Sequence, residues 1–407
     1  MRDIVFVAME DWDEVWRRNQ PVAAGFARRS PEHKVLFVGL SIDFSHLIRK
    51  GRFKQALKGI FRRQLASPPG FEFDNIRLLN SVKWLPNTLS WGRAFNRWLE
   101  RTHIRRACRK LGMKRPLLWI NPYYAVHMLG QLGEEGVIYD VGDDWTSFPQ
   151  PSEWLRKLVI AEDEELTRRA DAVIVVSKRL FEMKQDQARR LHHIPNGVYV
   201  ERYAAVCNRT LPAHPLARKW NRPVLGYTGS VHQDRLNIDM IVAVAKAYPQ
   251  ATIALVGPNM LEPAAVEALA ACKNIVLTGS VDFSEMPQIM SSFDVCIVPH
   301  LVNNFTESLS PLKLYEYLAS GLPTVSTPVS GFRNFPHLVH LAADNESFVN
   351  AIGVALSEPP SVRRQRQAAA TEHSWDARLD EIESVVASAL APSAAVTGPR
   401  METANAV

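Results

Sequence analysis

Short runs of β-branched and other apolar residues alternate along this chain with longer amphipathic stretches. Strands that alternate with helical patterns predict βα units and parallel sheets. In the first half we expect strands at Ile4–Ala8, Val35–Val38, Leu117–Asn121, Val137–Asp140, Ala172–Val176 and Leu191–Ile194. In the second half we expect them at Val224–Thr228, Thr252–Val256, Ile275–Thr278, Val295–Val298 and Thr324–Thr327. The sequence therefore predicts an α/β protein with two doubly wound, Rossmann-like units.

The length of 407 residues suits two domains. The segment CNRTLPAHPLARKWNRP (207–223) has three prolines and little periodicity, which is typical of a linker. The predicted organisation is a first domain at 1–205, a linker at 206–223, a second domain at 224–374, a helix at 375–390 that packs back towards the first domain, and a disordered tail at 391–407. Because ligands bind beyond the carboxyl ends of such strands, we expect a site in the cleft between the domains.

The charge and the cysteines limit the choice of partner and compartment. A net charge of +6 and a pI near 9.1 suit nucleotides, acidic lipids or nucleic acid without choosing among them. No nucleic-acid recognition motif is visible, so nucleic acid is not an expected partner. Four scattered cysteines without a CxxC spacing favour a reducing compartment. No apolar run approaches the roughly 20 residues that span a bilayer. We expect a cytoplasmic protein, at most peripheral at the inner face of the membrane.

The segment SLSPLKLYEYLASGLP in the second half predicts a helix that begins with a phosphate site. Ser310 suits the N-cap and Pro311 the first helical position. The amides of Leu312 and Lys313 would then be unpaired at the positive end of the helix dipole, where an anion fits. Glu316 lies on the same helix face as Lys313, and its carboxylate could accept hydrogen bonds from a ribose diol. A buried amphipathic helix with one surface ion pair would show the same spacing.

Several further segments follow one another in a fixed order before this helix. They are IPNGV (194–198), LGYTGS (225–230), LVGP (255–258), LTG (277–279) with MP (286–287), and FDVCIVP (293–299). Together with the helix they resemble nucleotide-sugar glycosyltransferases of the GT-B fold, in the family-4-like group. The resemblance covers roughly residues 170–335. It implies a nucleoside-diphosphate sugar in the second domain, an acceptor in the first domain, and no metal or other cofactor.

The first half shows a looser resemblance. Its segments DW (11–12), WRRNQ (16–20) and YDVGDDW (139–145) are similar to bacterial enzymes of cell-surface polysaccharide assembly, including teichuronic-acid and exopolysaccharide transferases. One feature departs from the family pattern, in which two glutamates stand eight residues apart. Glu316 matches the second, but position 308 is a serine and the nearby Glu307 is one residue off. That departure leaves the donor sugar and the stereochemical outcome open.

The resemblance and the residue chemistry together give candidate donor residues. Gly229 and Ser230 follow a strand, where a glycine lets the backbone approach a diphosphate closely; a plain βα turn has the same pattern. Arg235 could stabilise the departing diphosphate, or lie solvated on a helix. The donor set is Gly229, Ser230, Arg235, Ser310, Leu312, Lys313 and Glu316.

The candidate catalytic residues are Asp143, Asp144 and His127. An inverting transferase needs a base to deprotonate the acceptor, and Asp143 or Asp144 could serve. Either could instead cap a helix, and the pair could bind a metal, although the resemblance makes a metal unexpected. His127 could contact the donor sugar or be an ordinary helix histidine.

Asp11, Trp12 and Arg18 follow the first expected strand and form the candidate acceptor site. Trp12 could stack on a sugar face and Arg18 could bind a lipid pyrophosphate; a surface helix start would look alike. Further along, Arg49–Arg63 (RKGRFKQALKGIFRR) has seven basic residues, no acid and one apolar face. That pattern suits an anionic membrane surface or a helix that covers its own core.

The function that we expect is a hexosyltransferase-type, metal-independent glycosyltransferase. It would move a sugar from a nucleoside-diphosphate donor to a glycan or lipid-linked acceptor in bacterial surface polysaccharide synthesis. Two alternatives stay open: a nucleotide-sugar epimerase of the same fold, and a degenerate transferase that binds nucleotide without turnover.

Overall fold

The computed structural model describes residues 2–13, 15–44, 65–69, 73–148 and 150–391. The basic segment Arg49–Arg63 and nearly all of the expected tail lie outside the described residues. In the part of the chain that the structure describes, every helix is too short or too polar to span a bilayer.

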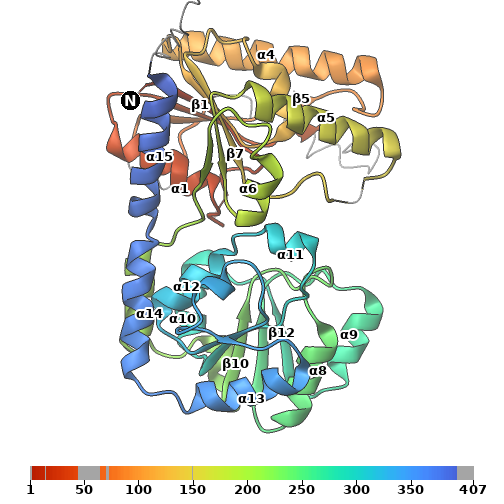
Figure 1. The fold of residues 1–407 in the computed structure, drawn as a ribbon, viewed down its shortest axis with the longest axis vertical. Helices are drawn as coiled ribbons and strands as arrows, with labels where there is room; N and C mark the ends of the chain where they lie inside the picture. Colours follow the sequence, from red (N-terminus) through yellow and green to blue (C-terminus); the bar gives the residue numbers. More distant parts are fainter. Residues whose placement is uncertain (1, 14, 45–64, 70–72, 149, 392–407) are drawn as a thin grey trace, which may run out of the picture.

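The first half folds into a seven-stranded sheet in the order β4-β2-β1-β6-β7-β8-β9 (Figure 1). Its pairs are parallel and its strands are almost wholly buried, as expected for a sheet covered on both faces. Phe6 pairs with Phe37 and Trp119 on the neighbouring strands, and its ring stacks on theirs at 5.6 and 5.5 Å. The strands are β1 (Ile4–Val7), β2 (Val35–Val38), β4 (Ile76–Leu79), β6 (Leu117–Ile120), β7 (Gly136–Val141), β8 (Ala172–Val175) and β9 (Leu191–His193), with β3 (Ile42–Asp43) and β5 (Val82–Lys83) forming a small separate pair.

The second half forms a six-stranded parallel sheet in the order β12-β11-β10-β13-β14-β15. The two sheets confirm the predicted fold class, although β4 and β15 were not expected from the sequence. In β4 the polar Arg77 interrupts the apolar run, and β15 has only two residues. The strands are β10 (Val224–Thr228), β11 (Thr252–Val256), β12 (Ile275–Gly279), β13 (Val295–Val298), β14 (Thr324–Ser326) and β15 (His340–Leu341).

Helices cover both faces of each sheet, so each sheet has two apolar core layers. Around the first sheet lie α1 (Asn19–Arg29), α4 (Ser90–Leu111), the 3₁₀ helix η1 (Tyr123–Met128), α5 (Glu153–Arg169), α6 (Lys178–Lys184) and α15 (Trp375–Leu390). Around the second lie α7 (Val200–Cys207), α8 (Ile238–Ala247), α9 (Pro263–Ala270), α10 (Met286–Met290), α11 (Asn304–Ser308), α12 (Leu312–Ser320), α13 (Asn345–Leu356) and α14 (Ser361–Glu372).

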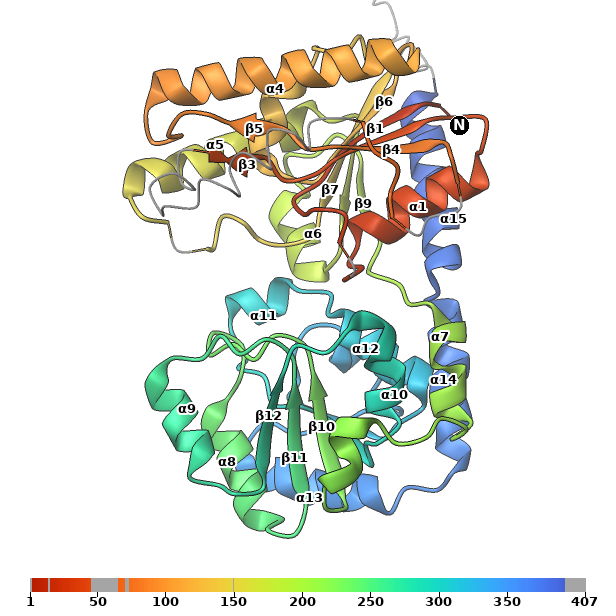
Figure 2. The ribbon, with the colours of Figure 1, turned by 180° about the vertical axis from the view of Figure 1, so that it is seen from behind.

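The chain crosses between the two halves at two points that lie side by side. Val198, after β9, accepts a hydrogen bond from the Trp375 amide at 3.0 Å and donates one to the carbonyl of His373 at 3.1 Å. Beyond these crossings α7 packs on α12 and α14, whereas α15 returns to α1 and β7 (Figure 2). Arg29 of α1 fixes α15 through Asp380, at 2.6 Å.

The proline-rich segment differs from its predicted role as a linker, because it packs against the second half. The His214 amide donates to Ser292 Oγ at 3.3 Å, and the Trp220 ring stacks on Phe293. Its prolines shape a surface loop with a short 3₁₀ helix, η2 (Pro215–Lys219), rather than a free connection. We propose domain boundaries at the crossings near residues 195–199 and 373–375.

Candidate active site

A cleft of about 830 Å³ separates the two halves, and the carboxyl ends of strands from both sheets line it. Two contacts hold its walls together. Asn196 donates from its amide to Ser310 Oγ at 3.1 Å and from its side chain to the Ser310 carbonyl at 2.7 Å. Phe148 meets Phe305 edge to face at 5.2 Å. Of the predicted site residues, the cleft is lined by Asp11, Arg18, Asp143, Gly229, Ser230, Arg235, Ser310, Leu312, Lys313 and Glu316.

The turn after β10 brings open backbone to the cleft. Gly229 has φ +120° and donates its amide to the Val256 carbonyl at 2.9 Å. Gly257, with φ +147°, faces it so closely that a Cβ there would lie 2.2 Å from the Gly229 carbonyl oxygen. Both positions therefore require glycine, and the result is a flat surface of main chain at the ends of two strands. A diphosphate that approached this surface would meet main chain and the amine of Lys313, which would lie 3.1 Å from a Cβ at Gly229.

Helix α12 starts one residue later than its sequence predicted. Pro311 occupies the N-cap position without a side-chain capping hydrogen bond, and Leu312 is the first helical residue. The prediction that Ser310 caps this helix is wrong, because its hydroxyl accepts the Asn196 amide instead. The first-turn amides of Leu312 and Lys313 have no partner within a helix and lie at the positive end of its dipole, facing the cleft.

Lys313 reaches back from α12 to the turn after β10. Its ammonium donates to the Tyr227 hydroxyl at 2.7 Å, and His300 Nε2 is 3.5 Å away. Burial, and then the charge of Arg235, hold the pKa of Lys313 well below its usual range. Burial likewise lowers the pKa of His300, helped by Lys313 and Arg235. Both side chains therefore favour their uncharged forms, and an anion beside them would stabilise the charged forms.

Tyr227 and His300 were not among the predicted site residues. Tyr227 lies in the LGYTGS segment, and His300 follows the Val295–Val298 strand, so position at a strand end could have indicated both. Only the fold shows that the two side chains meet Lys313.

Glu316 is the carboxylate of α12 that faces the cleft. Its Oε1 accepts a hydrogen bond from the Tyr203 hydroxyl at 2.9 Å. Burial raises its pKa, against the opposing effects of that hydrogen bond and of Arg202 and Lys313. A carboxylate held on one oxygen keeps acceptor capacity for a diol.

Asp143 follows β7 on the opposite wall. Burial raises the pKa of Asp143 to about 6; the charge of Arg235 opposes this and that of Asp144 adds to it. A carboxyl with a pKa near neutrality suits a general base. Arg235 packs its guanidinium 5.4 Å from the Phe305 ring centre, and its buried Nε has no hydrogen-bond partner among the described residues.

Three predicted site residues lie outside this cleft lining. Asp144 is buried and accepts hydrogen bonds from the amide and hydroxyl of Thr146, at 3.1 and 2.6 Å, so it fixes the turn. Trp12 meets Trp16 and Phe37 edge to face at 5.5 and 5.1 Å. In place of the expected acceptor contact, its ring packs on the core of the first sheet.

His127 lies in a second pocket within the first half. Its Nε2 is 3.2 Å from Glu100 Oε2, and its Nδ1 is 2.9 Å from the Tyr124 carbonyl. Both ring nitrogens have close partners, away from the cleft, so the structure does not place His127 with the donor residues.

Arg18 lines the cleft, but its charge is already paired. Its Nε lies 2.9 Å from both oxygens of the buried Asp140, and its Nη1 reaches the Pro195 carbonyl and Asn196 Oδ1 at 3.3 Å. It therefore connects β7 with the segment that crosses between the halves. Its buried Nη2 has no hydrogen-bond partner among the described residues, and the contact with a pyrophosphate stays a prediction.

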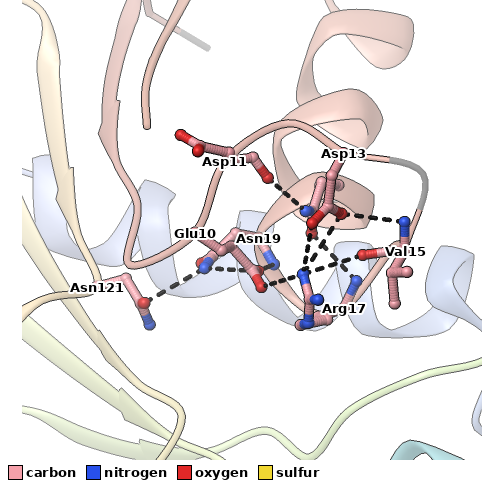
Figure 3. Close-up of polar contacts among 8 residues, drawn as sticks. Glu10, Asp11, Asp13, Val15, Arg17, Asn19 and Asn121 are labelled. Carbon is pink, nitrogen blue, oxygen red and sulfur yellow. Dashed lines mark hydrogen bonds and ion pairs between the residues drawn. The ribbon is translucent and has the colours of Figure 1, made fainter. Parts of the chain in front are cut away.

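A polar cluster after β1 forms the rest of this wall (Figure 3). Glu10 accepts hydrogen bonds from Asn19 Nδ2 at 2.9 Å and from Arg17 at 3.1 Å, and Asn19 also reaches Asn121 Oδ1 at 3.3 Å. Burial raises the pKa of Glu10, although Arg17 and Asn19 oppose this. The neighbouring Asp11 accepts from Asn80 at 2.7 Å.

Ser308 and Glu307 lie at and beside the position where the family pattern has its first glutamate. Glu307 forms a two-fold ion pair with Arg333, and Ser308 is buried and donates to the Phe305 carbonyl at 2.8 Å. Neither side chain lines the cleft. Among the described residues (2–13, 15–44, 65–69, 73–148 and 150–391), no group of three or more His, Cys, Asp or Glu side chains is placed to hold a metal ion.

Comparisons with known proteins agree with this architecture. Residues 222–358 match the family described as glycosyl transferases group 1. The whole chain superposes on sucrose-phosphate synthase from Thermosynechococcus elongatus with a TM-score of 0.67 at 16% identity, covering 95% of this chain and 99% of that one. HepE from Anabaena, in complex with UDP and glucose, gives 0.66 at 14% identity, with 95% and 100% covered. The chain has the GT-B fold, and residues 222–358 in its second half are similar to the group 1 glycosyltransferases.

One curated protein gives a more particular likeness. The teichuronic acid biosynthesis glycosyltransferase TuaH of Bacillus subtilis (strain 168) is 30% identical over 201 residues. The match covers 47% of this chain, which spans half the length of that relative.

Proposed function

We propose that this protein is a glycosyltransferase that moves a sugar from a nucleoside-diphosphate sugar to a glycan or lipid-linked acceptor. One observation carries the proposal: Lys313, the open glycine turn and the start of α12 converge in one cleft with Glu316. Basic side chains and backbone amides that converge in this way suit a diphosphate, and a carboxylate beside them suits a ribose. UDP and glucose in HepE, which shares the fold, support the same class of donor.

The residues of the second half bind the donor in this proposal. Lys313 and the first amides of α12 bind the diphosphate, and the uncharged amine takes up a proton as the phosphates arrive. Arg235 stabilises the charge that develops on the leaving diphosphate. Glu316 accepts hydrogen bonds from the ribose hydroxyls. Gly229 and Ser230 present main chain to the phosphates.

On the acceptor side, Asp143 is the base that removes the proton of the attacking hydroxyl in an inverting reaction. Its position at the end of β7, opposite the donor residues, supports this role. Asp11 and Glu10 offer carboxylate oxygens to acceptor hydroxyls, while Arg18 holds the wall in place. This scheme uses no metal, because Arg235 and the protonated Lys313 supply the positive charge for the diphosphate.

The relative named for teichuronic acid biosynthesis supports bacterial surface polysaccharide as the pathway. Such an acceptor would be lipid-linked, and we place the enzyme in the cytoplasm, peripherally bound at the inner face of the membrane. The four cysteines are all unpaired, in keeping with that compartment.

In the direct test, the protein is incubated with UDP-, GDP-, ADP- or dTDP-sugars that carry a labelled sugar, with and without a lipid extract from bacterial membranes. The released nucleoside diphosphate and the labelled lipid are then measured. The proposal expects labelled lipid from one nucleotide series, with nucleotide release that depends on the extract. Interconversion of the donor sugar without an acceptor would instead identify an epimerase. Nucleotide binding without any turnover would identify a degenerate transferase.

A further inference from the structure

Four large aromatic side chains are exposed in the first half, near the point where the start of α4 meets the start of α5. Trp91, Phe95 and Trp98 recur at helical spacing on one face of α4, and Trp154 begins the neighbouring α5. Between 41% and 61% of each residue is exposed. Arg93 joins the two helices, with its guanidinium 4.9 Å from the Trp154 ring centre. Single exposed apolar residues are common, but a group of this size marks an interaction surface.

The charge of α4 identifies the partner. This helix has seven arginines and lysines against the single acid Glu100. Arg105, Arg106, Arg109 and Lys110 are exposed farther along it. Tryptophan prefers the boundary between water and lipid, and interleaved basic residues are attracted to anionic lipid headgroups. The three exposed aromatic side chains of α4, the fourth on α5 and the basic residues of α4 together favour an anionic bilayer as the partner.

A pocket of about 280 Å³ opens between the same helices. Its two acids are already compensated. Arg97 pairs with Glu162, and Glu100 accepts from Ser41 and Ser81 at 3.0 and 3.1 Å and lies 3.2 Å from His127. Burial opposes ionisation of Glu100, but His127 and Lys83 outweigh it and hold its pKa below the usual range.

Two more cations line the pocket: Lys83, 5.1 Å from the Tyr124 ring centre, and Arg93, which donates to the Asn87 carbonyl at 3.2 Å. Within the described residues, neither Lys83 nor Arg93 forms an ion pair, and the opposite wall is apolar through Leu155, Leu158 and Val159. A wall with two cations on one side and aliphatic groups on the other suits a phosphate attached to a lipid.

We propose that the α4–α5 end of the protein docks on an anionic bilayer, with its exposed aromatic side chains in the interface and a lipid phosphate in the pocket between the helices. The proposal deepens the proposed function, since it brings the cleft to lipid-linked acceptors. Docking itself requires neither donor nor turnover, so the two can fail separately.

The test is sedimentation of the full-length protein with vesicles of phosphatidylcholine alone or mixed equally with phosphatidylglycerol. The wild type should bind the mixed vesicles at least tenfold more tightly than phosphatidylcholine vesicles, and less tightly as salt is raised. The double variant Trp91→Ser/Trp98→Ser should lose at least tenfold in affinity for mixed vesicles. Val354→Ser, an equally exposed apolar residue of α13 in the second half, is the matched control and should bind as the wild type does.

Lys83→Met keeps the aliphatic stem and tests the pocket. It should bind mixed vesicles several-fold more weakly and phosphatidylcholine vesicles unchanged. Wild-type binding by the double tryptophan variant would overturn the docking surface, and wild-type binding by Lys83→Met would overturn the phosphate site. Absence of vesicle binding by the wild type would overturn both, whatever the outcome of the transferase assay. The thermal shift of each variant with nucleoside diphosphate shows that its fold and cleft are intact.

Discussion

The ammonium of Lys313 lies 2.7 Å from the hydroxyl of Tyr227, a neutral partner, at the point where helix α12 meets the end of β10. Burial and the nearby Arg235 favour the uncharged amine, as the lowered pKa of Lys313 shows. The charged form of Lys313, which burial disfavours, becomes favourable when a diphosphate binds beside it. Stability and binding are therefore expected to change in opposite directions when this lysine is replaced.

The first prediction concerns the stability of the protein measured without nucleotide. Because the pKa of Lys313 is lower in the folded than in the unfolded state, the unfolded state binds more protons between the two values. Lys313 therefore lowers the free energy of unfolding at low pH, and this penalty is relieved as the pH rises above the pKa that Lys313 has in the folded state. Lys313→Met should unfold at an equal or higher urea concentration than the wild type at pH 7, and gain less stability between pH 7 and 9. A clear loss of stability at pH 7 would contradict the assigned environment.

The second prediction concerns the ribose. Glu316→Gln should weaken binding of UDP more than binding of 2′-deoxy-UDP, which keeps only the 3′-hydroxyl, so that the preference of the wild type for the ribonucleotide falls. A charge-assisted hydrogen bond of about 1.5–3 kcal/mol makes that preference roughly tenfold or more. Calorimetric titration measures both ligands.

Glu307→Gln is the matched control for Glu316→Gln, because the Glu307 carboxylate is paired with Arg333 and does not line the cleft. It should keep the ribose preference. The assignment of Glu316 would be wrong if both variants retained the preference, or if Glu307→Gln alone lost it.

The third prediction concerns proton transfer. If Asp143 is the base, the transfer rate should rise with pH through about 6 and then level, because the carboxyl must be ionised to accept a proton. Asp143→Asn should lower kcat by about 100- to 10,000-fold with unchanged affinity for the nucleotide. A variant that keeps more than half of the wild-type kcat would exclude Asp143 as the base.

The fourth prediction concerns the wall of the cleft. Arg18 and Asp140 form a buried ion pair, so Arg18→Met leaves a buried carboxylate without its partner and should cost about 3–5 kcal/mol in urea unfolding. Arg18→Met/Asp140→Asn should recover part of that loss. Arg28→Met removes an exposed pair with Asp376 and should cost less than about 1 kcal/mol. Equal losses for Arg18→Met and Arg28→Met would argue against the buried pair.

Much of the fold follows from local patterns. The apolar runs that predict β1, β10 and β13 are buried in parallel sheets, and the glycine after β10 is required by its positive φ. The order of the strands along the chain and their residue types were enough to predict where the site lies, because a parallel sheet places the carboxyl ends of its strands at one edge.

The roles of single side chains depend on partners far away in the sequence. His127 pairs with Glu100, Trp12 packs on Phe37, and Ser310 meets Asn196 across 114 residues. Nothing in the local pattern around these residues specifies such partners. For the same reason the sequence did not indicate that Tyr227 and His300 surround Lys313.

The most direct test of the donor site is calorimetric titration of UDP, GDP, ADP and dTDP into the wild type and into Lys313→Met. We predict that one of these nucleotides binds the wild type. The variant should bind it about 10- to 100-fold more weakly, because it lacks a charge-assisted contact to phosphate. Equal affinity in the two proteins, or no binding of any nucleotide to the wild type, would contradict the proposed donor site.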